Sequence, residues 1–221
     1  MLPNSTTGEL QAACEAMPLF PLPGAVFLPH TLLPLHVFEN RYRELVADTL
    51  AAEGYVAVPR LRPGWESNYE GNPRLFSVAG FGRIIRHQAL PDGRSNVVIL
   101  GLGRILIEGE LPTDTAYRIG HGRMLRDHIS LAGPTALAAQ ADRLRVIAGQ
   151  ALATRPRAAE RVVRLIEHQA EPIRFINAVA HMVLPDVEAR QHFLELDQVD
   201  ARVEALEELL AGTILENSAL A

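Results

Sequence analysis

Three copies of the pattern Gly-x-Gly-Arg form the most regular array of charged side chains in this 221-residue chain. They span Gly80–Arg83, Gly101–Arg104 and Gly120–Arg123. Guanidinium groups bind carboxylates through paired hydrogen bonds, so Arg83, Arg104 and Arg123 could together grip a carboxylate or an acidic peptide. Glycines two residues apart also suit a strand that bends tightly, because they relieve crowding on one face. The pattern therefore leaves a binding role and a structural role open.

The context of these copies does not fit a nucleotide-binding loop. A dinucleotide loop follows a strand and opens a helix, whereas β-type sequence continues after each arginine, as at Ile84-Ile85. The pattern accordingly predicts glycine-bearing strands and no bound dinucleotide.

The segment 60–73 carries a second set of candidate binding residues. It is polar and rich in glycine and proline, yet it contains Trp65, the only tryptophan, and Tyr69. Large aromatic side chains on loops are favoured anchors for partner proteins. Trp65 could equally cover the edge of the sheet. We take Trp65 and Tyr69, with the three arginines, as candidate partner-binding residues.

Catalytic and metal-binding patterns are weak. The eight histidines show no metal-ligand spacing. Glu39 and His36 are the best candidates for an uncommon hydrolase, but a glutamate at the start of a helix more commonly serves the helix dipole. We assign no catalytic, cofactor or metal residue and expect a protein without enzymatic activity.

The chain contains no lysine, since all 21 basic residues are arginine. This excludes from the chain a P-loop, a Ser-Lys dyad, a lysine Schiff base and a pyridoxal-phosphate linkage. The net charge of −5 argues against DNA or an anionic membrane as a partner. Cys14 is the only cysteine, and no signal peptide or bilayer-length apolar run is visible, so we expect a cytoplasmic protein.

Hydrophobic periodicity predicts an α+β chain. Residues 1–16 read as a flexible tail, residues 17–130 as a small, nearly closed β-barrel with one early helix, and residues 131–221 as a helical bundle. Strands are expected at 19–22, 31–37, 55–59, 75–89, 96–111 and 117–126, and the early helix at 39–52. The later helices are expected at 135–153, 156–169, 172–184, 186–195 and 198–216, with Arg202 on the solvent face of the last.

Several ordered motifs resemble the N-terminal domain of ATP-dependent Lon proteases. They are Pro18–Gly24, Leu33–Glu39, Arg41-Tyr42, Gly80–Ile84, Pro91–Arg94, Gly101–Arg104, Gln191–Glu195 and Arg202. The resemblance covers about residues 17 to 217, and it departs from the family pattern at Ile105 and Gly82. It implies a PUA-like β-barrel followed by helices, in a free-standing form without the ATPase and protease domains.

That resemblance implies a module that binds protein or unfolded peptide segments through its barrel edge and loops. A protease acting in trans is the partner that fold analogy suggests for it. The alternative is a PUA-like module that binds RNA or a small ligand, which the near-neutral barrel disfavours.

Overall fold

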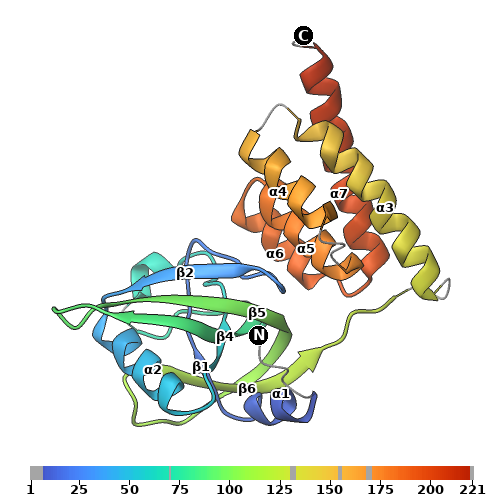
Figure 1. The fold of residues 1–221 in the computed structure, drawn as a ribbon. Coiled ribbons are helices and arrows are strands. Elements are labelled where there is room, and N and C mark those ends of the chain that lie inside the picture. Colours follow the sequence, from blue (N-terminus) through green and yellow to red (C-terminus); the bar gives the residue numbers. More distant parts are fainter. Residues whose placement is uncertain (1–6, 70, 130–132, 154–155, 168–170, 220–221) are drawn as a thin grey trace. The chain divides into compact units, whose positions relative to one another are not determined.

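The computed structural model describes residues 7–69, 71–129, 133–153, 156–167 and 171–219. The chain divides into two compact units, Met1–Leu125 and Arg126–Ala221, and each is described by itself. The observed division lies five residues before the expected one at 130/131. Strands in the first unit and helices in the second confirm the α+β class (Figure 1).

Six strands of the first unit form one sheet that closes on itself. The strands are β1 (Met17–Leu19), β2 (Leu32–Val37), β3 (Tyr55–Val58), β4 (Val78–Ala89), β5 (Ser95–Leu111) and β6 (Arg118–Leu125). Their order is β2-β5-β4-β3-β1-β6, and β5 also pairs with β6. The long strand β5 thus closes a ring of five strands, and β2 extends from it as an additional strand.

Two helices and a short 3₁₀ turn accompany this sheet: α1 (Thr7–Ala13), α2 (Asn40–Ala51) and η1 (Trp65–Asn68). Helix α2 buries Tyr42, Leu45, Val46 and Thr49, which recur at the predicted three- and four-residue spacing. The helix ends before Gly54, whose φ of 85° favours glycine and whose N–H donates to the carbonyl of Thr49.

Both faces of the sheet are covered, so strand β3 is buried along its whole length. Val56 and Val58 face a cluster that contains Phe20 and Tyr42. Ala57 faces a second cluster, which includes Phe81. This continuous apolar strand in the middle of the ring forms the core that positions the loops around it.

Each of the three Gly-x-Gly-Arg copies has a glycine at which another backbone segment approaches closely. A Cβ atom on Gly80 would lie 2.1 Å from the carbonyl oxygen of Phe27, and one on Gly101 would lie 2.5 Å from that of Leu28. A Cβ atom on Gly122 would lie 2.0 Å from the carbonyl oxygen of Leu106. These sites need glycine because a rigid backbone occupies the space of a side chain.

The second unit consists of helices α3 (Gly133–Ala151), α4 (Pro156–Glu167), α5 (Pro172–Val183), α6 (Val187–Glu195) and α7 (Val199–Ala219). Their bounds agree closely with the predicted ones. Arg202, however, was expected on the solvent face and is only 1% exposed. It is buried because its guanidinium donates to Asp127 at 2.7 Å and to the carbonyl of Leu196 at 2.8 Å.

The leading segment is expected to be a flexible tail with at most one helical turn around residues 9–16, and its described residues are more ordered than that. Residues 7–13 form α1, and the side chain of Cys14 is fully buried beside Met17 and Leu19. The carbonyl of Cys14 accepts a 2.9 Å hydrogen bond from the N–H of Gly122 on β6. The physical reason is that Leu10 and Ala13 pack against this apolar cluster.

Replacement of Gly80 by alanine should lower the free energy of unfolding by about 2 kcal/mol or more, because the new methyl group meets a backbone carbonyl. Urea unfolding followed by circular dichroism measures this. Gly149→Ala is the matched control, since no atom lies within 4 Å of the place that a methyl group on this helical glycine would take, and alanine favours helix. Equal stability of the two variants would contradict the close approach.

The Cys14 thiol should resist thiol reagents in the folded protein. Burial raises its pKa to about 11, so little thiolate exists at pH 8 and the reagent has no access to it. Reaction with a chromogenic disulfide should be slow in buffer and fast in 8 M urea, as measured by absorbance. Fast reaction in buffer would contradict the packing of Cys14 against the sheet and would favour a flexible segment there.

Candidate functional site

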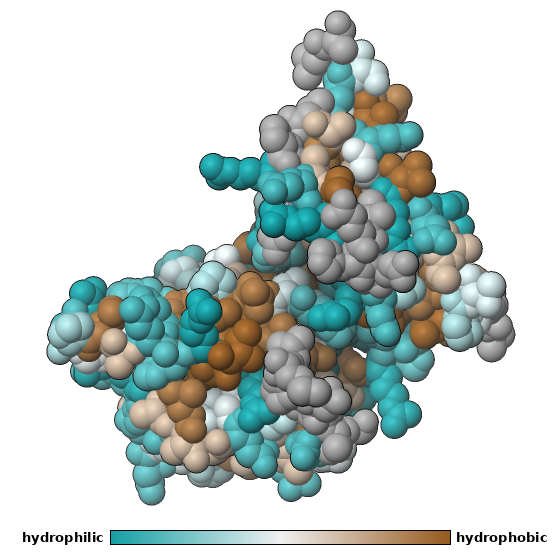
Figure 2. All heavy atoms as spheres, viewed as in Figure 1, coloured by the Kyte–Doolittle hydropathy of each residue, from teal (hydrophilic) through white to brown (hydrophobic). Residues whose placement is uncertain are grey.

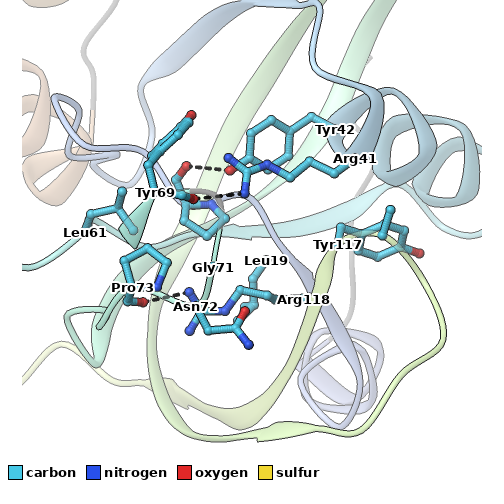
Figure 3. Close-up of a pocket in the computed structure, with 12 residues that line it drawn as sticks. Leu19, Arg41, Tyr42, Leu61, Tyr69, Gly71, Asn72, Pro73, Tyr117 and Arg118 are labelled. Atoms are coloured by element: carbon cyan, nitrogen blue, oxygen red, sulfur yellow. Dashed lines mark hydrogen bonds between the residues drawn. The ribbon is translucent and has the colours of Figure 1, made fainter. Parts of the chain in front are cut away.

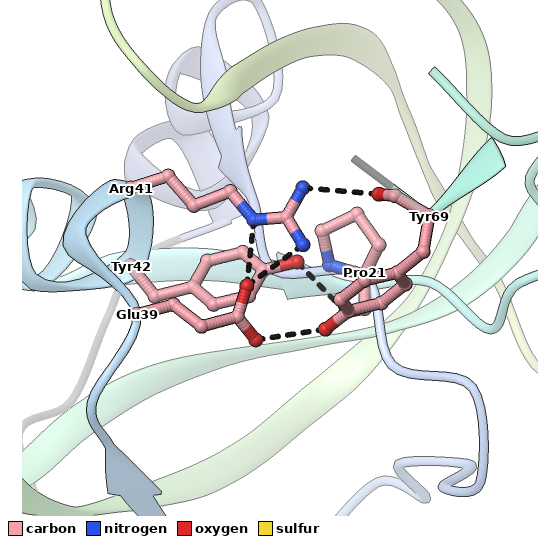
Figure 4. A network of polar contacts seen from close by, with 5 residues as sticks. All are labelled: Pro21, Glu39, Arg41, Tyr42 and Tyr69. Carbon is pink, nitrogen blue, oxygen red and sulfur yellow. Dashed lines mark hydrogen bonds and ion pairs between the residues drawn. The ribbon is translucent and has the colours of Figure 1, made fainter. Parts of the chain in front are cut away.

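A polar network around Glu39 fastens the loop 60–73 to the start of helix α2 (Figure 4). The hydroxyl of Tyr69 donates to Glu39 Oε1 at 2.7 Å, and Arg41 Nε donates to Glu39 Oε2 at 2.9 Å. Arg41 Nη1 also donates to the backbone carbonyl of Tyr69 at 3.3 Å. Glu39 and Arg41 therefore hold Tyr69 through both its side chain and its backbone.

Arg41 is also held by two aromatic rings. Its guanidinium carbon lies 4.7 Å from the ring centre of Tyr42 and 4.8 Å from that of Tyr69. Such contacts are favourable because the ring faces carry negative partial charge. Burial, followed by the hydrogen bond to Glu39, raises the pKa of Tyr69, so this phenol stays protonated as a donor at neutral pH.

A cavity of about 360 Å³ lies beside this network (Figure 3). One wall comes from the loop, at Tyr69 and Pro73, and the opposite wall comes from Arg118, the first residue of β6, and from Tyr117 directly before it. Tyr42 of α2 also contributes to the lining. The lining combines aromatic rings with a few fixed polar groups, which is typical of ligand pockets.

Two tyrosines of this cavity are fixed by their hydroxyl groups. Tyr42 stacks on Phe20 with ring centres 4.2 Å apart and donates to the carbonyl of Pro21 at 3.2 Å. Tyr117 donates to Asp48 Oδ2 at 2.9 Å. Burial, then the hydrogen bond to Asp48, raises the pKa of Tyr117 to about 12. Both rings are therefore rigid neutral walls at physiological pH.

Arg118 joins this cavity to two others. A second cavity of about 760 Å³ and a third of about 380 Å³ are also lined by Arg118 and Asn72. Arg118 Nε donates to Glu110 Oε2 at 2.7 Å, and its Nη1 donates to the carbonyl of Pro73 at 2.8 Å. We call these three neighbouring cavities, which share Asn72 and Arg118, the loop-side groove.

The two predicted aromatic residues lie at this groove. Tyr69 lines the first cavity, and the Trp65 ring packs edge-on against Tyr69, with ring centres 5.5 Å apart and an interplanar angle of 66°. Both side chains are half-buried. Whether they bind a partner stays a prediction, but their placement on one side of the groove suits such a role.

The three predicted arginines occupy three different environments. Arg83 is half-buried, with its guanidinium carbon 5.4 Å from the ring centre of Tyr55. Arg104 is 2% exposed, whereas Arg123 is exposed and forms an ion pair with Glu108 at 3.2 Å. That these three residues bind one carboxylate together stays a prediction.

The hydrolase candidates are engaged with separate partners. Glu39 belongs to the network with Arg41 and Tyr69, whereas His36 Nδ1 lies 2.8 Å from Asn96 Oδ1. Within the described residues, no three histidine, cysteine or acidic side chains gather closely enough to hold a metal ion. Over the same residues, no helix is long and apolar enough to cross a membrane.

Sequence reasoning missed Arg118, Tyr117 and Asn72 as lining residues. Arg118 is the first residue of strand β6 and Tyr117 directly precedes it, and only ring closure between β1, β5 and β6 brings them to the loop. The sequence did indicate Arg41 as a site residue, because it lies two residues after Glu39 and forms the Lon-like motif Arg41-Tyr42.

Comparison with known proteins identifies the family. The sequence profile described as the ATP-dependent protease La (LON) substrate-binding domain matches residues 16–212. The chain belongs to this family. The Lon resemblance drawn from the sequence motifs is thereby confirmed, and a role in substrate recognition is the general function of the domain.

The relatives are Lon proteases. A Lon protease of Anaeromyxobacter dehalogenans is 25% identical over 88% of this chain and 23% of its own length. One from Chloroflexus aurantiacus is 35% identical over 47% of this chain and 12% of its own length. The chain thus spans about a quarter or less of these relatives.

Solved structures show the same fold. The N-terminal domain of Mycobacterium avium complex Lon protease superposes with a TM-score of 0.68 at 16% identity, over 89% of this chain and 98% of that one. A Lon N-terminal domain protein from Xanthomonas campestris gives 0.58 at 22% identity, over 89% of this chain and 97% of its own. Both confirm the α+β fold.

The stability of the protein should fall in alkali in a way that depends on Tyr117. A phenol whose folded-state pKa is raised stabilises the fold fully below its unfolded pKa of about 10 and loses this effect as the pH rises through about 12. Urea midpoints measured between pH 8 and 11.5 should therefore drop above pH 10. The drop should be smaller in Tyr117→Phe, and equal drops would refute the assignment.

Proposed function

We propose that this chain is a non-enzymatic module that binds extended or unfolded protein segments in the loop-side groove. One observation carries the proposal: in a member of a substrate-binding family, three neighbouring cavities that share Asn72 and Arg118 lie beside an aromatic loop that is fastened in place by Glu39 and Arg41. A groove that is already formed binds without the cost of ordering its walls.

The first cavity suits a large apolar side chain of a bound segment. Tyr42, Tyr69 and Tyr117 line it together with leucine and proline side chains, and it holds about 360 Å³. Rigid tyrosines supply contact area at low entropic cost. Trp65 beside Tyr69 extends the aromatic surface outward from this anchor position.

Strand β2 offers a second surface for extended segments. Among the described strands it pairs with β5 alone, so one of its edges has no partner strand. Figure 2 shows apolar side chains over this part of the sheet, where Leu32 is 48% exposed. Pro34 lacks an N–H and limits uncontrolled pairing at the edge, so we assign β2 a supporting role.

Within the proposal, bound segments are sensed or delivered to a protease acting in trans, by analogy with the Lon proteases that this chain matches. The protein acts in the cytoplasm, in keeping with its single cysteine. DNA and membranes are not partners, because the net charge of −5 gives no general attraction to phosphates.

Binding of an unfolded probe tests the function. Reduced, carboxymethylated lactalbumin labelled with fluorescein should bind the wild-type protein, and the native disulfide-bonded form should not, as measured by anisotropy. Trp65→Ala should weaken binding about fivefold or more, because an aromatic anchor contributes at least about 1 kcal/mol. Its thermal midpoint should change little, since the side chain is only half-buried.

Val146→Ala is the matched control, because Val146 is a 61% exposed apolar residue of the second unit. It should bind the probe like the wild type. Failure of the wild type to bind the unfolded probe, or equal binding by Trp65→Ala, would contradict the proposal. A salt-sensitive shift of structured RNA without binding of the probe would instead support the RNA-binding alternative.

A further inference from the structure

Two arginines face each other where the loop 60–73 enters and leaves the sheet. Leu61 and Leu75 form an isolated antiparallel bridge, and the N–H of Arg62 donates to the carbonyl of Arg74 at 2.8 Å. Arg62 and Arg74 are thus opposite each other across this bridge. Like charges in directly opposite positions repel, so the arrangement is unfavourable unless an anion lies near.

Both side chains line the 760 Å³ cavity of the loop-side groove. Arg62 is held in place, because its Nε donates to the carbonyl of Leu75 at 3.0 Å and its guanidinium carbon lies 4.9 Å from the ring centre of Phe76. These contacts leave the terminal nitrogens of Arg62 available to a ligand. Arg74 is exposed beside it.

The carboxylates of the same cavity are already paired. Glu110 forms an ion pair with Arg118, and Glu108 forms one with Arg123. Among the described residues, neither Arg62 nor Arg74 forms an ion pair with a carboxylate. Within the described part of the chain, the lining of this cavity therefore has an excess of positive charge, which lies at these two residues.

We propose that Arg62 and Arg74 form a carboxylate-binding subsite, which selects protein segments that carry an acidic side chain near an apolar one. The inference rests on the proposed binding of extended segments in the groove and names their chemical class. An aspartate or glutamate bound here accepts hydrogen bonds from both guanidiniums and relieves their mutual repulsion. The apolar neighbour occupies the adjoining cavity beside Tyr69 and Tyr117.

A peptide fits this subsite better than a nucleic acid does. Among the described residues, these two arginines have no carboxylate partner, so the pair offers two positive charges, whereas a nucleic-acid backbone needs a row of them. Glu108 and Glu110 line the same cavity and would repel successive phosphates. A peptide can place one carboxylate between the two arginines and neutral residues along the rest of the groove.

Two fluorescein-labelled 12-residue peptides provide the test. Both contain the same tryptophan and leucine residues, and two glutamates in the first are glutamines in the second. The wild-type protein should bind the glutamate peptide about tenfold more tightly, which matches a charge-assisted pair in a partly exposed site. Raising the salt concentration should reduce this preference.

The double variant Arg62→Gln/Arg74→Gln should bind the two peptides equally and keep the affinity of the wild type for the glutamine peptide. Arg86→Gln/Arg174→Gln removes the same charge from two exposed arginines outside the groove and should keep the preference. Circular dichroism shows whether each variant is folded.

Equal binding of the two peptides by the wild type, or the same preference in the Arg62→Gln/Arg74→Gln variant, would overturn the subsite. If carboxymethylated lactalbumin still binds in that case, the proposed function stands and only its acidic preference falls. If neither peptide nor lactalbumin binds, both fail. Loss of uridylate-oligonucleotide binding in the double variant, with no peptide preference in the wild type, would show a phosphate site instead.

Discussion

The close packing of the segment 27–28 on the glycines of β4 and β5 is the constraint on which the first unit depends. The carbonyl oxygens of Phe27 and Leu28 occupy the space that side chains on Gly80 and Gly101 would fill. Hydrogen bonds then tie the following residues to β5, because His30 donates to the carbonyl of Gly101 and Gly101 donates to that of Thr31. These hydrogen bonds align the residues that follow, Leu32–Val37, so that they pair with β5 as strand β2.

The position of the groove follows from the packing of residues 27–28 on β4 and β5. Helix α2 starts three residues after β2, and Glu39 is the residue that directly precedes its first turn. Glu39 and Arg41 then hold Tyr69, whose loop follows strand β3 in the sequence. The binding surface is therefore built from local hydrogen bonds, but their location is set by the backbone packing at Phe27, which belongs to the same buried cluster as Tyr42 of the groove.

Local patterns made the elements of the fold and half of the candidate site predictable from sequence, as with the buried face of α2. Trp65 and Tyr69 were found because aromatic residues are unusual in a polar loop. Glycine spacing indicated close approach but could not name its partner, the carbonyl of Phe27. Periodicity placed Arg202 at the surface, because the spacing of apolar residues along a helix gives no information about a partner outside that helix. The partner is the carboxylate of Asp127. The groove wall from β6 depends on ring closure, in which β6 pairs with the distant strand β1. The local sequence of either strand does not indicate this pairing.

Ring closure also sets the order in which the protein can fold during synthesis. Strand β1 needs β3 and β6, so residues 17–19 leave the ribosome long before residues 118–120 exist to pair with them. Until β6 has left the ribosome, the nascent first unit has unpaired strand edges and an exposed apolar core. A protein whose family recognises other proteins as substrates thus passes, while it is being made, through a state with the exposed apolar segments of an unfolded client.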